Sequence, residues 1–300
     1  MAVRKKKITS DFWFDLIIYF VLILVCVATL YPFLNVLALS FNESGDAVRG
    51  GIHIFPRKFT LQNYQTVFQY KNLVRAFFNS TLRMVIGTLL GLVFTSMTAF
   101  VLSRKDFMFR KFAMTLFAVT MYVSGGLIPG YLLIRQLGLF NNFMVYILPG
   151  IIMVYCVILM RTYMDSLSFS LQESAMIDGA NDMLIFARII LPLCLPSLAT
   201  VALFYAVGHW NSWFDAYLYT SRRPNLTLLQ FELQKIILDT AASSGHAGAS
   251  SEELKNRALQ VTPKSIQMAI TVIVITPIMA VYPFIQKYFI KGMTVGSVKG

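Results

Sequence analysis

Long apolar runs dominate the sequence and are separated by short polar segments. Six of these runs are long enough to cross a bilayer as helices, since about 20 apolar residues span its hydrocarbon core. Helices also satisfy their own backbone hydrogen bonds, as a lipid environment requires. The pattern therefore predicts an all-α integral membrane protein with six transmembrane helices. The predicted spans are residues 16–40, 77–102, 112–134, 143–163, 191–219 and 266–289.

The composition agrees with this class and argues against a nucleic-acid-binding protein. The 300-residue chain is 57% hydrophobic and 13% charged, which is about half the charged fraction of a typical soluble domain. Its net charge of +12 does not indicate a nucleic-acid partner, because the Lys and Arg residues lie mostly between the apolar runs. Membrane proteins normally carry their basic residues there.

The distribution of basic residues predicts the orientation of the spans. Positive charge concentrates on the short cytoplasmic segments of membrane proteins. If the N-terminus is inside, three dense basic clusters fall on that side, so we expect both termini to be cytoplasmic. The clusters are Arg4, Lys5, Lys6 and Lys7; Arg104, Lys105, Arg110 and Lys111; and Lys287, Lys291 and Lys299.

This orientation predicts the organisation of the chain. A cytoplasmic N-terminus (1–15) precedes the six-helix domain (16–290), and a cytoplasmic tail (291–300) follows it. Two long loops, residues 41–76 and 221–265, then lie on the outer side.

Each outer loop contains one segment with a recognisable character. Residues 60–64 predict the start of a short amphipathic helix at the membrane surface. Residues 240–258 are poor in hydrophobic side chains and rich in Ser, Ala and Gly, which predicts a stretch that is flexible or becomes ordered on a partner.

Sequence signatures of catalysis are missing. The chain contains no G-x-x-x-x-G-K-[ST] phosphate loop, no H-E-x-x-H zinc motif and no G-x-S-x-G nucleophile elbow. Its three histidines, His53, His209 and His246, lie far apart, and its three cysteines lack metal-ligand spacing. We therefore expect a protein that is not an enzyme and that holds no metal.

Several polar residues fall inside the predicted spans, where they are costly. Arg83 either extends toward the membrane surface or faces a cavity. Segment 209–215 either belongs to an aromatic belt at the interface or lines a translocation path, in which rings stack on sugars and polar groups bond hydroxyls. The candidates for such a path are Asn79, Arg83, His209, Trp210, Asn211 and Asp215.

Two pairs of glycines have a spacing that lets membrane helices pack closely. These pairs are Gly87 with Gly91 and Gly126 with Gly130. They predict association between helices and say nothing about function.

The polar segment between the predicted fourth and fifth spans has the signals of a helical hairpin. Ser170 and Glu173 have the spacing of a capping box, which predicts a helix starting at Ser170. Gly179 is a stop signal for that helix, and Asn181 or Asp182 can cap a second one. A rigid protrusion of this shape suits insertion into a groove on a soluble partner.

The hairpin (residues 168–192) also carries a sequence that resembles the EAA motif of ABC-importer permeases. Residues 173–180 read ESAMIDGA, where the family pattern is roughly E-A-A-x-x-D-G-A. Ser174 replaces the first alanine with another small residue. The sequence IILP at 189–192, followed by Pro196, matches the second half of the motif.

The remainder of the chain resembles the carbohydrate subfamily of these permeases, and within it the second, shorter permease of maltose-type importers. The matching stretches are residues 78–81, 131–139, 210–214 and 286–300. The loop sequence 40–64 resembles the branch that imports aldouronates and complex polysaccharides.

The resemblance implies a fold, a location and partners. The fold would be that of a type I ABC-importer permease in the bacterial cytoplasmic (inner) membrane. The partners would be a second, homologous permease that completes a heterodimer, two ATPase subunits that bind ATP and Mg, and an extracytoplasmic solute-binding protein. The chain itself would hold no cofactor and would import an oligosaccharide by alternating access, with uronic-acid-containing oligosaccharides among the candidate substrates.

The resemblance also implies roles for particular residues. Those that would contact an ATPase through the hairpin are Glu173, Ser174, Ala175, Asp178, Gly179, Ala180 and Pro192. The tail would reach the ATPase dimer through Thr294, Gly296 and Lys299.

Two other functions remain open from the residues alone. An ion-coupled secondary transporter would need acids or histidines near the bilayer midplane, whereas Asp215 lies close to the outer end of its predicted span. An ABC permease for a non-sugar solute would have the same architecture, and the C-terminal sequence FIKGMTVGSVKG argues for carbohydrate instead. The basic residues of the outer loops suit either an anionic oligosaccharide or an acidic binding protein; they are Arg49, Arg57, Lys58, Arg222 and Arg223.

Overall fold

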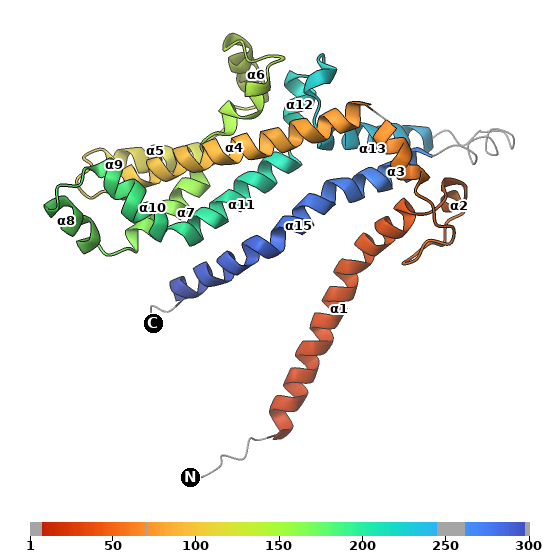
Figure 1. Cartoon of the computed structure of the whole chain (residues 1–300), viewed down its shortest axis with the longest axis horizontal. Helices are drawn as coiled ribbons and strands as arrows, with labels where there is room; N and C mark the ends of the chain where they lie inside the picture. Colours follow the sequence, from red (N-terminus) through yellow and green to blue (C-terminus); the bar gives the residue numbers. More distant parts are fainter. Residues whose placement is uncertain (1–7, 70, 245–261, 298–300) are drawn as a thin grey trace. The chain divides into compact units, whose positions relative to one another are not determined.

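The structure, a computed structural model, describes residues 8–69, 71–244 and 262–297 of the chain (Figure 1). Within these residues the regular elements are helices, and the only β-type pairing described is an isolated bridge between Asn42 and Phe59. The all-α prediction is thus confirmed for this part of the chain. The residues form two units, one of 1–70 with 236–273 and the other of 71–235 with 274–300.

The first unit is built on the long N-terminal helix α1 (Ile8–Ser40). Its side chains from Phe12 to Leu30 are exposed and almost all apolar, which is the character of a helix surrounded by lipid. Two short helices follow, α2 (Ser44–Val48) and α3 (Gln62–Gln69), and α3 confirms the helix predicted from residues 60–64.

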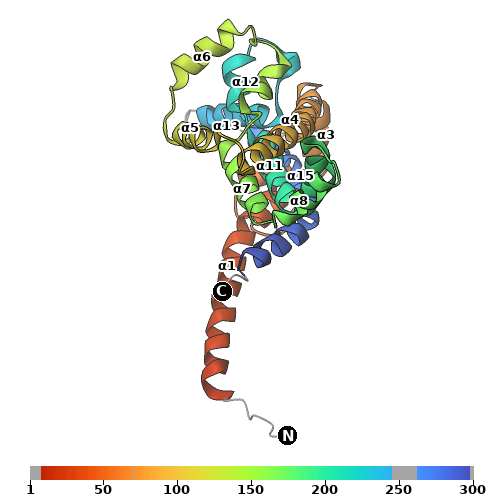
Figure 2. The same ribbon diagram turned by 90° about the vertical axis from the view of Figure 1, so that its left-hand side faces the viewer.

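The second unit is organised around α4 (Lys71–Ser103). This helix packs along α7 (Val154–Asp165) and α11 (Leu195–Asn211), and Figures 1 and 2 show the three side by side. Their buried side chains form the main core, which includes Phe100, Met160 and Tyr205. The other helices of this unit up to residue 226 are α5 (Arg110–Tyr122), α6 (Leu127–Gln136), η1 (Phe143–Tyr146), η2 (Leu148–Gly150), α8 (Ser170–Ile177), α9 (Asp182–Ile185), η3 (Phe186–Ile190), α10 (Leu191–Leu193), α12 (Phe214–Tyr219) and η4 (Pro224–Leu226).

Two helices have some residues assigned to the first unit and some to the second. Helix α13 covers Leu229–Ser244, and α15 covers Pro263–Ser297. Residues 240–244 therefore extend a helix, although the sequence pattern predicted them to be flexible. Residues 245–258 of that predicted flexible stretch lie outside the described residues.

Three of the predicted spans are single helices that are long and apolar enough to cross a membrane. They are Phe12–Ser40, Asn72–Ser103 and Pro263–Ala280. The other three predicted spans are pairs of helices bent at a break, so the described residues contain up to six spans if each pair crosses the membrane once.

The breaks occur where the backbone lacks helical support. The helices Arg110–Tyr122 and Leu127–Gln136 meet at 116°, and the sequence between them ends in Gly125 and Gly126, which disfavour a helix. Both views show α6 turning away from α5 (Figures 1 and 2). The predicted span over 112–134 is therefore a pair of helices bent at a break instead of one helix.

A second break is stabilised by a side chain from another helix. The helix pair around residues 151–153 bends by 47°. The Tyr205 hydroxyl accepts the backbone N–H of Met153 at 2.8 Å and donates to the carbonyl of Ile151 at 3.2 Å. Thr95 on α4 also bonds this hydroxyl, at 2.7 Å. A broken helix is tolerated at membrane depth only when its free backbone groups find such partners.

The third break lies between two prolines. The chain bends by 83° between Leu193 and Leu195. Pro192 has no N–H to donate and its ring crowds the carbonyl one turn earlier, and the preceding turn, η3, is a wider π-helix. The predicted single helix over 191–219 is consequently divided into α10, α11 and α12.

Candidate functional site

The hairpin begins with α8, whose start differs in one respect from the prediction. The helix does begin at Ser170, but no capping box forms. The backbone N–H groups of Gln172 and Glu173 donate to the carbonyl of Phe169, and the Ser170 hydroxyl bonds that of Ser168 at 2.7 Å. Ser170 is already inside the first turn, so its side chain is not placed to cap it.

The turn of the hairpin follows the predicted chemistry. Gly179 has a φ of +83°, a left-handed conformation that glycine adopts without steric cost. The N–H of Ala180 donates to the carbonyl of Ala175 at 2.9 Å, and that of Gly179 to Met176 at 3.0 Å. These two bonds form a Schellman motif, which satisfies the last carbonyls of α8 and reverses the chain.

The second helix of the hairpin is capped as predicted. The side-chain oxygen of Asn181 accepts the N–H of Leu184 at 2.9 Å. Asp182 lies in the first turn, where a carboxylate interacts favourably with the helix dipole. Pro192 then lies in α10, at the start of the bend into α11.

The hairpin has a buried side and an exposed side. Ala175, Ile185 and Phe186 join the main core, and the ring of Phe186 lies 5.3 Å from that of Phe100 on α4. Of the residues that the motif assigns to partner contact, Glu173, Ser174, Asp178 and Gly179 are exposed and Ala180 is half-buried. Ala175 is the exception, because it is buried in the core. The fold thus fixes one side of the hairpin and leaves the other free to bind.

An apolar side chain at the tip of the hairpin was missed by the sequence reasoning. Ile177 directly precedes the turn and is 86% exposed. Met176, Met183 and Leu184 of the same hairpin are also exposed, and several exposed apolar side chains on one small surface are typical of a binding site. Ile177 occupies one of the two positions, between the E-A-A and D-G-A parts of the motif, at which the motif specifies no residue. Its place between these two parts is the sequence signal that could have identified it.

Arg104 was recognised only as part of a basic cluster, yet it ties both helices of the hairpin to the end of α4. Its guanidinium donates to the Gln172 side chain on α8 at 3.2 Å and pairs with Asp182 on α9 at 3.3 Å. It also forms two 3.0 Å bonds to Asp106, and these hold the pKa of the Asp106 carboxyl below its ordinary value. Only 11% of the Arg104 side chain is exposed.

Among the candidates for a translocation path, three lie in one region of the second unit. Arg83 on α4 pairs with Asp215 at 2.5 Å, and Asp215 also accepts a bond from Ser212 at 3.1 Å. The Arg83 guanidinium lies over the ring of Tyr146, 5.0 Å from its centroid. One turn further along α4, the ring of His209 lies against Gly87.

The other three candidates bond groups elsewhere in the unit. The indole N–H of Trp210 donates to the carbonyl of Val274 at 2.9 Å. The Asn79 amide donates to the carbonyls of Asn225 and Thr227, and the Asn211 side chain accepts a bond from Gln230 at 3.2 Å. In the C-terminal segment, Thr294 and Gly296 lie in the last turns of α15, and Lys299 lies outside the described residues.

Comparison with known proteins relates the whole chain to one class. No family model matches it. It is 37% identical over 287 residues to the polygalacturonan/rhamnogalacturonan transport system permease protein YtcP of Bacillus subtilis (strain 168), covering 96% of this chain and 98% of that protein. It is also 30% identical over 275 residues to the arabinooligosaccharides transport system permease protein AraQ of Halalkalibacterium halodurans, covering 90% of this chain and 91% of that protein.

A solved structure has the same fold. A chain of a bacterial ABC transporter involved in the import of the acidic polysaccharide alginate superposes with a TM-score of 0.83 at 28% identity, covering 96% of this chain and 100% of that one. The protein is thus a multi-pass membrane permease rather than an enzyme. More narrowly, it belongs to the carbohydrate ABC-transporter permeases.

Proposed function

We propose that this permease imports an acidic oligosaccharide and that its hairpin receives the conformational signal of an ATPase. The observation that carries the proposal is the hairpin itself, which exposes Glu173, Ile177 and Gly179 on one side and is held rigidly on the other. Rigidity is needed, because a displacement at the tip reaches the transmembrane helices only if the hairpin does not yield.

The complete transporter would contain several further subunits. We infer a second, homologous permease as heterodimer partner, two ATPase subunits that bind ATP and Mg, and a solute-binding protein on the outer side. The inferred topology has six spans and two cytoplasmic termini, supported by the three single and three bent candidate spans and by the placement of the basic clusters.

In this proposal ATP favours one state of an alternating-access equilibrium. A ligand shifts such an equilibrium only through contacts that differ between the two states. Glu173 supplies a polar contact and Ile177 an apolar one to a groove on the ATPase, and the small residues Ser174, Gly179 and Ala180 permit close approach. Arg104 positions the hairpin, and the tail residues Thr294, Gly296 and Lys299 provide a second contact with the ATPase dimer.

The proposed substrate class rests on relatives and on charge. The names of two similar proteins refer to polygalacturonan and to alginate, which are acidic polysaccharides. Arg83 lies beside Asp215 and near His209, a grouping that the proposed path uses to orient a sugar acid, with Asn79, Trp210 and Asn211 further along. Uptake of oligogalacturonates by reconstituted transporter, compared with neutral oligosaccharides of equal length, tests this class.

The role of the hairpin is tested by replacing Gly179 with leucine. Leucine is strained in the left-handed turn at φ +83°, and a β-carbon there meets no heavy atom within 4 Å, so we expect the helices to stay folded while the tip changes shape. We expect ATP hydrolysis to continue while substrate uptake is lost. Gly138→Leu is the matched control, because Gly138 also has a positive φ, of +67°, and open space around it but lies outside the hairpin. Normal uptake by the Gly179 variant would overturn the coupling role.

A further inference from the structure

The chain after α1 forms a closed loop that returns to the end of that helix. Asn42 and Phe59 form an antiparallel bridge. The N–H of Glu43 donates to the carbonyl of Lys58 at 2.9 Å, and that of Thr60 to Phe41 at 2.8 Å. Residues 41–43 and 58–60 are therefore joined side by side, and the residues between them make one self-contained loop.

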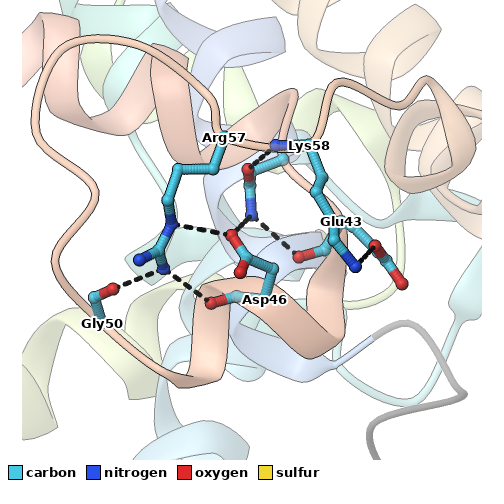
Figure 3. Close-up of polar contacts among 6 residues, drawn as sticks. Glu43, Asp46, Gly50, Arg57 and Lys58 are labelled. Carbon is cyan, nitrogen blue, oxygen red and sulfur yellow. Dashed lines mark hydrogen bonds and ion pairs between the residues drawn. The ribbon is translucent and has the colours of Figure 1, made fainter.

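A polar network fixes the conformation of this loop. The carboxylate of Asp46 accepts bonds from Arg57 at 3.0 Å and from Asn42 at 3.1 Å. The Arg57 guanidinium also donates to the carbonyls of Asp46 and Gly50, as Figure 3 shows. A second ion pair joins Lys58 to Glu43 at 3.1 Å. Because Asp46 is buried and multiply bonded, the loop has one defined shape.

The middle of the loop runs back along α1. The side-chain amide of Asn35 donates to the carbonyl of Ile52 at 2.7 Å and to that of His53 at 3.0 Å. One turn earlier on α1, the Tyr31 hydroxyl bonds the His53 ring at 2.8 Å. Tyr31 lies about 13 Å before Ser40, the last residue of α1, measured along the helix axis, because an α-helix rises about 1.5 Å per residue.

The sequence of α1 sets the depth of Tyr31 and Asn35 in a bilayer. Asp15 is the last charged residue before a long uncharged run that begins at Leu16. A helix needs about 20 apolar residues to cross the hydrocarbon core, and a run of that length starting at Leu16 ends at Asn35. Tyrosine is typical of this boundary. The apolar helix itself continues to Ser40. The loop residues bonded to Tyr31 and Asn35 therefore lie at the boundary between hydrocarbon and headgroups or just inside it.

The residues that follow them are apolar and unusually exposed. Ile52 is buried, but Ile54 is 45% exposed and Phe55 is 80% exposed. Arg57 and Lys58, with side chains 47% and 61% exposed, come directly afterwards. Each pairs with a carboxylate of the same loop, so polar ion pairs follow the apolar apex along the chain. Exposed apolar side chains next to Arg and Lys, whose long stems reach out to the water, are typical of a segment that binds the membrane interface.

We propose that residues 52–58 are an interfacial anchor that inserts Ile54 and Phe55 into the lipid leaflet at the end of α1. The anchor fixes the depth of α1 in the bilayer through the bonds that Tyr31 and Asn35 make to the same segment. A soluble protein docking on the transporter would meet the surface at or beyond the end of α1, whereas the residues leading into this apex are bonded to Tyr31 and Asn35, before that end. The bilayer is for that reason the occupant that the geometry favours.

The proposal is tested with a nitroxide spin label at position 55. The variant Phe55→Cys is made in a Cys26→Ala background, because Cys26 is exposed whereas Cys156 and Cys194 are buried. The complete transporter is reconstituted in nanodiscs of three parts phosphatidylcholine to one part phosphatidylglycerol, and the signal of the labelled background is subtracted. Power saturation then compares collisions with oxygen, which concentrates in lipid, and with a water-soluble nickel complex.

We expect the label at position 55 to collide several-fold more with oxygen than with the nickel complex. The matched control is Gln65→Cys on α3, an exposed position whose neighbour Tyr64 bonds Ser40 at the very end of α1, and it should favour nickel. A label at position 55 that favours nickel would overturn the anchor. A label that is water-accessible in the transporter alone and becomes immobilised when purified solute-binding protein is added would also overturn it, and would assign the segment to that protein.

Discussion

The ring of Tyr205 on α11 lies directly against the backbone of Gly91 on α4, so that a β-carbon at Gly91 would be 2.5 Å from the ring. One turn earlier on α4, a β-carbon at Gly87 would be 2.3 Å from His209. The two rings are themselves stacked, with centroids 6.1 Å apart. The predicted close packing of this glycine pair is confirmed, and its partner helix is α11. By contrast, no heavy atom comes within 4 Å of the corresponding position at Gly126 or Gly130 in the described part of the chain.

Replacing Gly91 with alanine should therefore destabilise the contact between α4 and α11. Tyr205 cannot withdraw freely, because its hydroxyl bonds Thr95 and the backbone at the break near Met153. Overpacking of this kind costs about 1–3 kcal/mol, and we expect a lower midpoint in thermal unfolding of the purified complex. Gly130→Ala should leave the midpoint unchanged. Equal midpoints for the two variants would contradict the packing described here.

Shortening Ile177 should weaken the proposed ATPase contact without affecting the fold. Its side chain is exposed in this chain, so its removal costs little here, whereas burial against a partner is worth about 2 kcal/mol. The Ile177→Ala variant is then expected to bind the ATPase about thirtyfold more weakly, measured by titrating ATPase subunits onto the reconstituted permeases. Ile128→Ala, at an exposed site on α6, serves as the control and should bind normally. Unchanged affinity in Ile177→Ala would remove this residue from the interface.

Loss of the Arg104 guanidinium should uncouple hydrolysis from uptake. Arg104→Gln removes the ion pair with Asp182, and Arg104→Lys keeps the charge but loses the fork that reaches Gln172 and Asp182 together. We expect the ratio of substrate imported to ATP hydrolysed to fall in the glutamine variant and to recover partly in the lysine variant. A residue that only stabilised the fold would lower both rates together. Arg188→Gln, at an exposed arginine in the same region, should keep the normal ratio.

The loop beyond α1 should loosen in acid because of Asp46. Hydrogen bonds from Asn42 and then from Arg57 hold the pKa of Asp46 below its ordinary value, which is about 3.9 for an unperturbed aspartate. A carboxyl whose pKa is lowered by folding stabilises the fold above the unfolded pKa, and that contribution is lost as the pH falls through the folded pKa. A nitroxide at position 55 should therefore become more mobile as the pH falls below the ordinary aspartate pKa of about 3.9, which electron paramagnetic resonance line shapes would show.

The variant Asp46→Asn identifies the group responsible. It lacks the carboxylate at every pH, so the label should be mobile already at pH 7 and should change little on acidification. If the label in the Asp46→Asn variant instead showed the same acid transition as the parent, another group would control the loop.

Local signals predicted much of the hairpin and of the class of protein. The length of the apolar runs indicated spans, since crossing a bilayer is a requirement on consecutive residues. Gly179 and Asn181 predicted the turn and the second cap because helix termination and capping depend on neighbours a few residues away. The capping box at Ser170 is the exception. Phe169 occupies the N-cap position, so Ser170 is already the first helical residue and its side chain does not cap the helix.

What the sequence by itself determined is thus what adjacent residues decide: an all-α membrane protein, the places of its long apolar segments, and a polar hairpin between two of them. Only the tertiary structure decided which distant groups meet. Arg104 lies 68 residues before Gln172, and Arg83 lies 132 residues before Asp215. The bends also depend on such meetings, as Tyr205 supplies hydrogen bonds to the break at residues 151–153, more than 50 positions earlier. No periodicity or cap encodes these pairs, since their energy arises only when packing has already brought the helices together.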